Sequence, residues 1–275
     1  DEANETVIVT LSSPGNATLG DDQVHTYTIT DNDATPSLAI NDVAITEAAA
    51  NSTFTVTLSA VSGLAVTVNY ATSNGTATAG ADYTAKSSTQ LTIAAGATTA
   101  TFTVGVLADT LDEANETATL TISSPANATI SDATGTLTIN DNDATPTLAI
   151  NDVTAANENA ANSTFTVTLS AAAGRDVTVN YATSNATATA GADYTAKSGT
   201  ATISAGDTTT TFTVGVLADS LDEPNETVTL TLSSATNATI SDATGTLTIN
   251  DNDDAPTVDF NATSSSGSES ISSKA

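Results

Sequence analysis

The segment VGVLADSLDEPNETVTL, residues 214–230, decides the fold because an acidic loop joins two alternating apolar stretches within it. The alternation through Phe212, Val214 and Val216 stops at Asp219 and resumes at Val228. Apolar residues at every second position predict β-strands, so the segment is expected to form a strand, a loop and a second strand. Four carboxylates lie between or at the ends of these strands, at positions 219, 222, 223 and 226.

The acidic loop predicts a metal site. Carboxylates this close together repel one another unless a counter-charge lies between them. Ca²⁺ is a hard cation that takes about six to eight oxygen ligands, so it suits such a loop. The chain has no cysteine, which excludes a thiolate site for a soft metal as well as any disulfide.

Internal repetition sets the domain organisation. The acidic segment recurs at 104–120 as VGVLADTLDEANETATL, and its last part opens the chain as DEANETVIVTL. DNDATP stands at 31 and 141 and DNDDAP at 251, a period of 110 residues, which is the length of a whole domain. We expect residues 1–33 to be the C-terminal part of a truncated repeat, 34–143 and 144–253 to be complete domains, and 254–275 to be the N-terminal strand of a further repeat.

Short alternating stretches rich in Thr and Val predict seven strands in the first complete domain. They fall at 37–40, 53–60, 66–71, 88–93, 100–107, 116–122 and 135–140. No window has a convincing apolar period of 3.6, so no helix is expected. This pattern is typical of an immunoglobulin-like sandwich of two antiparallel sheets. We therefore predict an all-β chain of tandem sandwiches, arranged end to end because the linker DNDATP is short.

The apolar members of these strands are the expected core, with the equivalent residues of the next domain. In the first complete domain they are Phe54, Val56, Leu58, Val66, Val68, Tyr70, Leu91, Ile93, Phe102, Val104, Leu120, Ile122, Leu137 and Ile139.

Composition excludes several functions. The net charge is −28, from 32 acidic and four basic residues, which disfavours nucleic acid and anionic membranes as partners. No run of apolar residues is long enough for a membrane span. The lone histidine, His25, has no counterpart in the complete domains, so no nucleophile–base pair can be assembled there. Paired carboxylates alone do not make a glycosidase without a cleft and aromatic platforms, and tryptophan is absent. We expect no enzymatic activity.

Several motifs together resemble one family. DSLDEPNETVTLTLSS followed by NATISDATGTLTINDND, with GADYTA upstream, is similar to the Calx-beta domain. That family takes its name from the calcium-sensing modules of sodium–calcium exchangers and occurs in tandem in large bacterial surface proteins. The resemblance covers essentially the whole chain. It implies a sandwich in which carboxylates at one end bind calcium near the boundary with the following domain.

The resemblance also implies a set of calcium ligands in each repeat. The expected ligands are Glu47, Asp82, Asp109, Asp112, Glu113, Glu116, Asp141, Asn142 and Asp143 in the first complete domain, Glu158, Asp193, Asp219, Asp222, Glu223, Glu226, Asp251, Asn252 and Asp253 in the second, and Glu2, Glu5, Asp31 and Asp33 in the N-terminal part. The exchanger modules carry consecutive aspartates where this chain has Ala108 and Ala218. Fewer carboxylates favour one or two calcium ions per site.

These features predict a calcium-stiffened segment of a long extracellular adhesin, stalk or fibre at a bacterial surface. Its expected partners are calcium ions, further repeats of the same polypeptide and neighbouring copies in a filament. The alternatives are a calcium-sensing regulatory module and an accessory region of a secreted enzyme. Short linkers and near-identical repeats favour the mechanical role.

Overall fold

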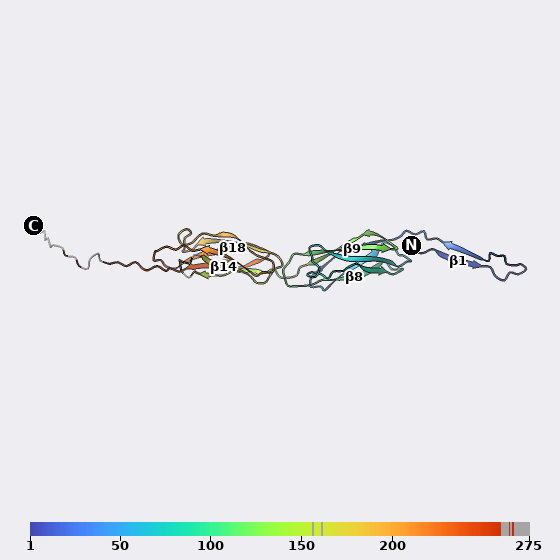
Figure 1. The fold of residues 1–275 in the computed structure, drawn as a ribbon, viewed down its shortest axis with the longest axis horizontal. Helices are drawn as coiled ribbons and strands as arrows, with labels where there is room; N and C mark the ends of the chain where they lie inside the picture. The colour runs from blue at the N-terminus through green and yellow to red at the C-terminus, as the bar shows by residue number, and fades with distance from the viewer. Residues whose placement is uncertain (156, 161, 260–263, 265, 267–275) are drawn as a thin grey trace. The chain divides into compact units, whose positions relative to one another are not determined.

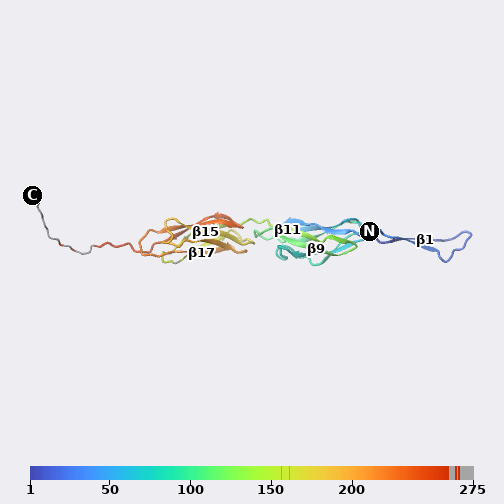
Figure 2. The same ribbon diagram turned by 90° about the horizontal axis from the view of Figure 1, so that it is seen from above.

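The computed structural model describes residues 1–155, 157–160, 162–259, 264 and 266. Every regular element in this part of the chain is a strand, so it contains no helix that could cross a membrane. The chain divides into two compact units, residues 1–144 and 145–275. Each unit contains a sandwich of two sheets that lie face to face (Figure 1, Figure 2), which confirms the all-β, immunoglobulin-like prediction.

Unit 1 contains a hairpin and one sandwich. The strands are β1 (Glu5–Thr10), β2 (Val24–Ile29), β3 (Ser37–Ile40), β4 (Val43–Thr46), β5 (Asn51–Leu58), β6 (Val66–Asn74), β7 (Thr89–Ile93), β8 (Thr99–Gly105), β9 (Glu116–Ala126), β10 (Thr129–Asp132) and β11 (Thr134–Asn140). One sheet has the order β10-β3-β5-β8 and the other the order β4-β11-β9-β6-β7. The hairpin β1-β2 forms a sheet of its own.

Unit 2 repeats the sandwich. The strands are β12 (Thr147–Ile150), β13 (Val153–Thr154), β14 (Asn162–Leu169), β15 (Val177–Asn185), β16 (Ser198–Ile203), β17 (Thr209–Gly215), β18 (Glu226–Thr236), β19 (Thr239–Asp242) and β20 (Thr244–Ile249). Its sheets have the orders β17-β14-β12-β19 and β13-β20-β18-β15-β16, which match those of unit 1 strand for strand.

The alternation of threonine with apolar residues explains both layers. In the pairing of β5 with β8, Thr53 lies opposite Thr103 and Phe54 opposite Phe102, so the pair presents hydroxyls on one face and phenyl rings on the other. Both rings lie in the core, where Phe102 also stacks on Tyr70 with 3.8 Å between ring centroids. Burying one such face against the other sheet holds each sandwich together.

The core prediction is confirmed except at Leu91, which is only partly buried. Leu91 lies on the edge strand β7, which has a neighbour on one side only. Tyr83 was not included in the predicted core, yet it is 1% exposed. It lies outside the alternating strands, in the loop between β6 and β7, so periodicity could not identify it.

Two strands per sandwich were not predicted, and each forms a parallel pair at the edge of an otherwise antiparallel sheet. In unit 1, β10 pairs with β3 and β4 with β11. The chain passes from one sheet to the other at Asn41 and Asp42, between β3 and β4. Asn41 Oδ1 accepts the N–H of Thr55 at 2.6 Å, and Asp42 Oδ1 accepts the N–H of Thr136 at 2.7 Å. The two side chains therefore bond to the backbone of both sheets at the crossing point. Neither β4 nor β10 contains a buried residue, so neither forms the alternating buried row on which the prediction depended.

The N-terminal hairpin lacks a covered apolar face. Every residue of β1 and β2 is exposed, including Val9 and Tyr27. The equivalent strands β9 and β11 bury their apolar residues in the complete sandwich. At the other end, residues 254–259 form no strand, and most of 260–275 lies outside the described residues. The four domain boundaries stay predictions.

We predict that Gly135→Ala destabilises unit 1. A Cβ at Gly135 would lie 2.6 Å from the carbonyl oxygen of Asn41, inside the crossing point, and such overpacking costs about 1–3 kcal/mol. Gly15→Ala is the matched control, because a Cβ there meets nothing within 4 Å. Calorimetric melting of the full chain measures both variants. Equal melting of Gly135→Ala and the unchanged protein would show that the crossing tolerates a side chain.

Candidate metal centre

Loops that are distant in sequence bring carboxylates together in unit 1. Glu47 follows β4, Asp109 follows β8 and Asp143 follows β11, and one oxygen of each lies within 4.8 Å of the others. A second group, built from Asp82, Glu113 and Glu116, has the same spacing. Glu47 is buried, which is unusual for a carboxylate.

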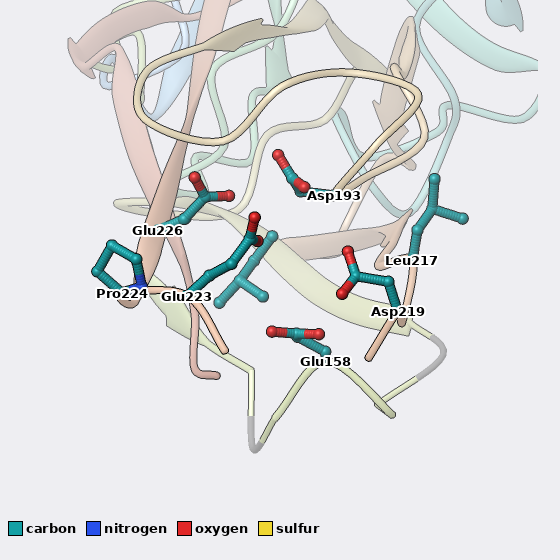
Figure 3. A pocket seen from close by; sticks show the side chains of 8 residues that line it. Glu158, Asp193, Leu217, Asp219, Glu223, Pro224 and Glu226 are labelled. Atoms are coloured by element: carbon teal, nitrogen blue, oxygen red, sulfur yellow. The ribbon is translucent and has the colours of Figure 1, made fainter. Parts of the chain in front are cut away.

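Unit 2 also contains two groups, and each differs in one member from the repeat equivalent of a group in unit 1. They are made by Glu158, Asp251 and Asp253, and by Asp193, Asp219 and Glu223, again with oxygens within 4.8 Å of one another. Figure 3 shows the carboxylates of Glu158, Asp193, Asp219, Glu223 and Glu226 turned towards a common space.

That space is small. Besides the carboxylates it is lined by Leu217, Pro224 and Ile249, and the cavity volume is about 10 Å³. A cavity needs roughly that volume to hold one water molecule, so the pocket admits an ion and not an organic ligand. Ile249 is the counterpart of Ile139 in the predicted core. Leu217 and Pro224 were not predicted, since single apolar residues in an acidic loop carry no sequence signal.

Crowding changes the electrostatics of these carboxyl groups. Burial, followed by the nearby Asp143, raises the pKa of Glu47 to about 7. Burial and the neighbouring Asp82 raise the pKa of Glu116 to about 7. In unit 2, burial and Asp193 likewise raise the pKa of Glu226 to about 7. A proton on one carboxyl group of each pair relieves the repulsion, and a bound cation would relieve it instead.

The donor set fits calcium. Glu47 Oε1, Asp143 Oδ2, Asp251 Oδ1 and Asp253 Oδ2 are buried side-chain oxygens without a hydrogen-bond partner. Two oxygens that share a calcium ion lie no more than about 4.6–5.2 Å apart, twice the Ca–O distance, and the oxygens of each group lie within 4.8 Å of one another. All donors are carboxylates, so a hard cation is preferred over zinc or copper.

Some of the residues expected as ligands have other contacts. Asp112 is buried and Asp222 exposed, and both lie outside the four groups found among the described residues. Asn142 Oδ1 accepts the N–H of Ala48 at 3.0 Å, and Asn252 Oδ1 accepts a hydrogen bond from Asn159 at 3.2 Å.

The remaining expected ligands also lie outside these groups. Asp141 Oδ1 accepts the N–H of Glu113 at 3.1 Å. Glu226 belongs to neither group of unit 2, although it lies beside Asp193 and lines the pocket described above. In the N-terminal part the expected ligands that lie outside the groups are Glu2, Glu5, Asp31 and Asp33. Asp31 is partly buried and the other three are exposed.

One supporting residue was missed. Asn115 Oδ1 accepts the N–H of Asp141 at 3.1 Å, and Asn225 makes the same bond to Asp251. These bonds tie the acidic loop to the exit of the last strand. The repetition of Asn in DEANET and DEPNET was the available signal.

The fold and the acidic groups define a class of tandem β-sandwich modules with candidate cation sites. The model of the Calx-beta domain matches residues 30–143 and 141–253. The chain therefore belongs to the Calx-beta family and carries two of its domains in tandem. Calx-beta domains are calcium-binding modules without enzymatic activity of their own.

Solved structures give a weaker likeness. CBD12 from CALX1.2 is 17% identical, with 78% of this chain and 99% of that chain covered and a TM-score of 0.38. The apo-form Calx CBD1 domain is 20% identical, with 40% of this chain and 100% of that chain covered and a TM-score of 0.38. No curated protein matches the chain. The family assignment rests on the domain model.

We predict that the metal-free chain loses stability as pH rises from about 4.5 to about 7. The folded pKa values of Glu47, Glu116 and Glu226 lie near 7, above the ordinary value of 4.5, so their stabilising contribution is complete at low pH and is lost as pH rises through the folded pKa. Melting in chelator at several pH values measures this. Replacing all three by Gln should flatten the profile, and a rise in stability with pH in the unchanged chain would contradict the assignment.

We further predict that Glu226→Gln weakens calcium binding without destabilising the metal-free chain. The amide keeps the size of the side chain but removes a charge that repels Asp193. Asp207→Asn is the control, since Asp207 is exposed and does not line the pocket that Glu226 lines. Isothermal calorimetry gives the affinity and thermal melting gives the stability. Unchanged affinity in Glu226→Gln would remove this residue from the site.

Proposed function

We propose that the chain is a calcium-stiffened structural segment of a long extracellular adhesin, stalk or fibre at a bacterial surface. Its proposed partners are calcium ions, further repeats of the same polypeptide and neighbouring copies in a filament. One observation carries the proposal: each sandwich places carboxylates from separate loops and from the exit of its last strand around a shared point.

A calcium ion at that point would act as a cross-link. Glu47 lies between β4 and β5, Asp109 between β8 and β9, and Asp143 beyond β11. These strands belong to both sheets of the sandwich. An ion bound by all three carboxylates would hold the two sheets and the exit segment in one arrangement, and it would do so without a disulfide.

The exit segment is the part that a mechanical role needs to hold. Asp143 is followed by Ala144, Thr145 and Pro146, and β12 starts at Thr147. Proline restricts the backbone of this short connection. An ion that fixes Asp143 therefore limits the directions in which the chain can leave the domain. This favours a stiff connection over a flexible one.

Calcium sensing is the second candidate, and the repulsion between the carboxylates favours it. Carboxyl groups with pKa values near 7 push the loops apart when neither proton nor ion is present, so ion binding could drive a change in loop conformation. An accessory role beside a secreted enzyme is the third, and a catalytic domain elsewhere on the polypeptide would identify it.

Calcium affinity tests the proposal. Extracellular structural modules bind with Kd values of about 10⁻⁴–10⁻³ M, whereas sensors bind at about 10⁻⁷–10⁻⁵ M. We expect calorimetric titration of the full chain to give the weaker range, and melting at 100-fold excess over Kd to show about 2.7 kcal/mol of added stability.

Magnesium is the control ion, because it requires shorter bonds and releases its water reluctantly. Submicromolar affinity coupled to a change in the hydrodynamic radius would support sensing instead. No calcium binding and identical melting in chelator would overturn both candidates.

A further inference from the structure

The loop between β6 and β7 holds one acidic ligand candidate, Asp82, in a network of backbone bonds. Asp82 Oδ2 accepts the N–H of Thr78 at 2.6 Å, and the N–H of Asp82 donates to the carbonyl oxygen of Thr78 at 3.0 Å. Gly80, at the turn between them, has φ +94°, a conformation that favours glycine. The side chain of Asp82 is thus oriented by its own loop.

The same loop touches the segments that carry the other carboxylates of its group. The carbonyl oxygen of Asp82 accepts the N–H of Leu107 at 2.9 Å, two residues before Asp109. The N–H of Ala77 donates to the carbonyl oxygen of Thr117 at 2.9 Å, one residue after Glu116. Displacement of this loop would therefore move Asp82 relative to its neighbours.

A tyrosine and an asparagine fasten the loop to the core. The ring of Tyr83 is 1% exposed, and its hydroxyl donates to Asn74 Oδ1 at 2.7 Å. The N–H of Ala79 donates to the same oxygen at 3.0 Å. Asn74 is the last residue of β6, so one amide oxygen binds the residues on both sides of the Gly80 turn to a core strand.

Unit 2 repeats this arrangement. The Tyr194 hydroxyl and the Ala190 N–H both donate to Asn185 Oδ1, at 2.7 and 3.0 Å. The N–H of Thr189 donates to Asp193 Oδ2 at 2.6 Å. Tyr194 is also 1% exposed. The pairs Tyr83–Asn74 and Tyr194–Asn185 are called the loop latches below.

We propose that the latch tyrosines, Tyr83 and Tyr194, are positioning residues for the cation site, which they serve through Asn74 and Asn185 without touching the ion. The inference rests on the proposed calcium function. A core tyrosine needs no hydroxyl for packing, and here the hydroxyl reaches the single oxygen that also binds the loop backbone. Without it, the loop is held by one bond fewer and Asp82 samples more positions, so the ion finds fewer of its ligands already in place.

The test replaces both tyrosines in the full chain by phenylalanine, which keeps the buried ring. We expect Tyr83→Phe with Tyr194→Phe to weaken calcium binding about fivefold in calorimetric titration, the change that corresponds to one ordinary hydrogen bond. In the metal-free chain, hydrogen exchange at the amides of Ala79 and Ala190 should accelerate several-fold. Exchange at strand amides such as that of Leu120 should not change.

Tyr70→Phe with Tyr181→Phe is the matched control. These tyrosines are also buried, but they stack on Phe102 and Phe212, and the Tyr181 hydroxyl points to Gly199 on β16, away from the latch. The control should leave calcium affinity and loop exchange unchanged. Asn74→Ala with Asn185→Ala tests the acceptor of the tyrosine hydroxyls. When these changes are combined with Tyr83→Phe and Tyr194→Phe, the fold-loss of calcium affinity should be smaller than the product of the two separate fold-losses.

The outcomes separate the two proposals. Normal calcium affinity in the latch variant, with the unchanged chain binding calcium, overturns the positioning role and leaves the calcium function standing. If the unchanged chain binds no calcium, the proposed function fails, and exchange at Ala79 and Ala190 alone decides the latch. If the control with Tyr70→Phe and Tyr181→Phe weakened calcium binding as much as the latch variant, the positioning role would also be overturned. Loss of any buried tyrosine hydroxyl would then have the same effect.

Discussion

Repulsion between carboxylates held within 4.8 Å of one another is the constraint on which the proposed function of this chain depends. The groups form at the ends of strands from both sheets, where the fold brings separate loops together. Burial strengthens the repulsion, because Glu47 and Glu158 are withdrawn from water that would otherwise screen them. Each folded domain is thus under local electrostatic strain, which a proton or a divalent ion relieves.

The rest of the sandwich must be rigid enough to hold that strain. Apolar rows from two sheets form one continuous core in each unit, and aromatic rings stack at its centre. Loops are fastened to this core by side chains of Asn and Asp that bond to backbone groups, as at Asn41, Asn74 and Asn115. Asparagine supplies the acceptor oxygen there without adding another negative charge to an already acidic chain.

The sequence was most informative where a pattern repeats along the strands. Alternation located seven of the nine strands of the first sandwich and almost all of its core, because burial of one face of a sheet imposes a period of two. It failed for β4 and β10, which contain no buried residue, and for Tyr83, which reaches the core from a loop. Parallel pairing was also missed, since it depends on where the chain changes sheets and not on any local pattern.

The sequence by itself determined the fold class, the two-domain repeat and the concentration of acidic residues in particular loops, because these follow from local periodicity and charge. Only the tertiary structure decided which acids meet. It joined Glu47 to Asp143 across nearly a whole domain, left Asp222 exposed, and engaged Asn142 with the backbone of Ala48. The physical reason is that a carboxylate group of this kind is assembled by long-range strand pairing, and distances between loops are not encoded in any single segment.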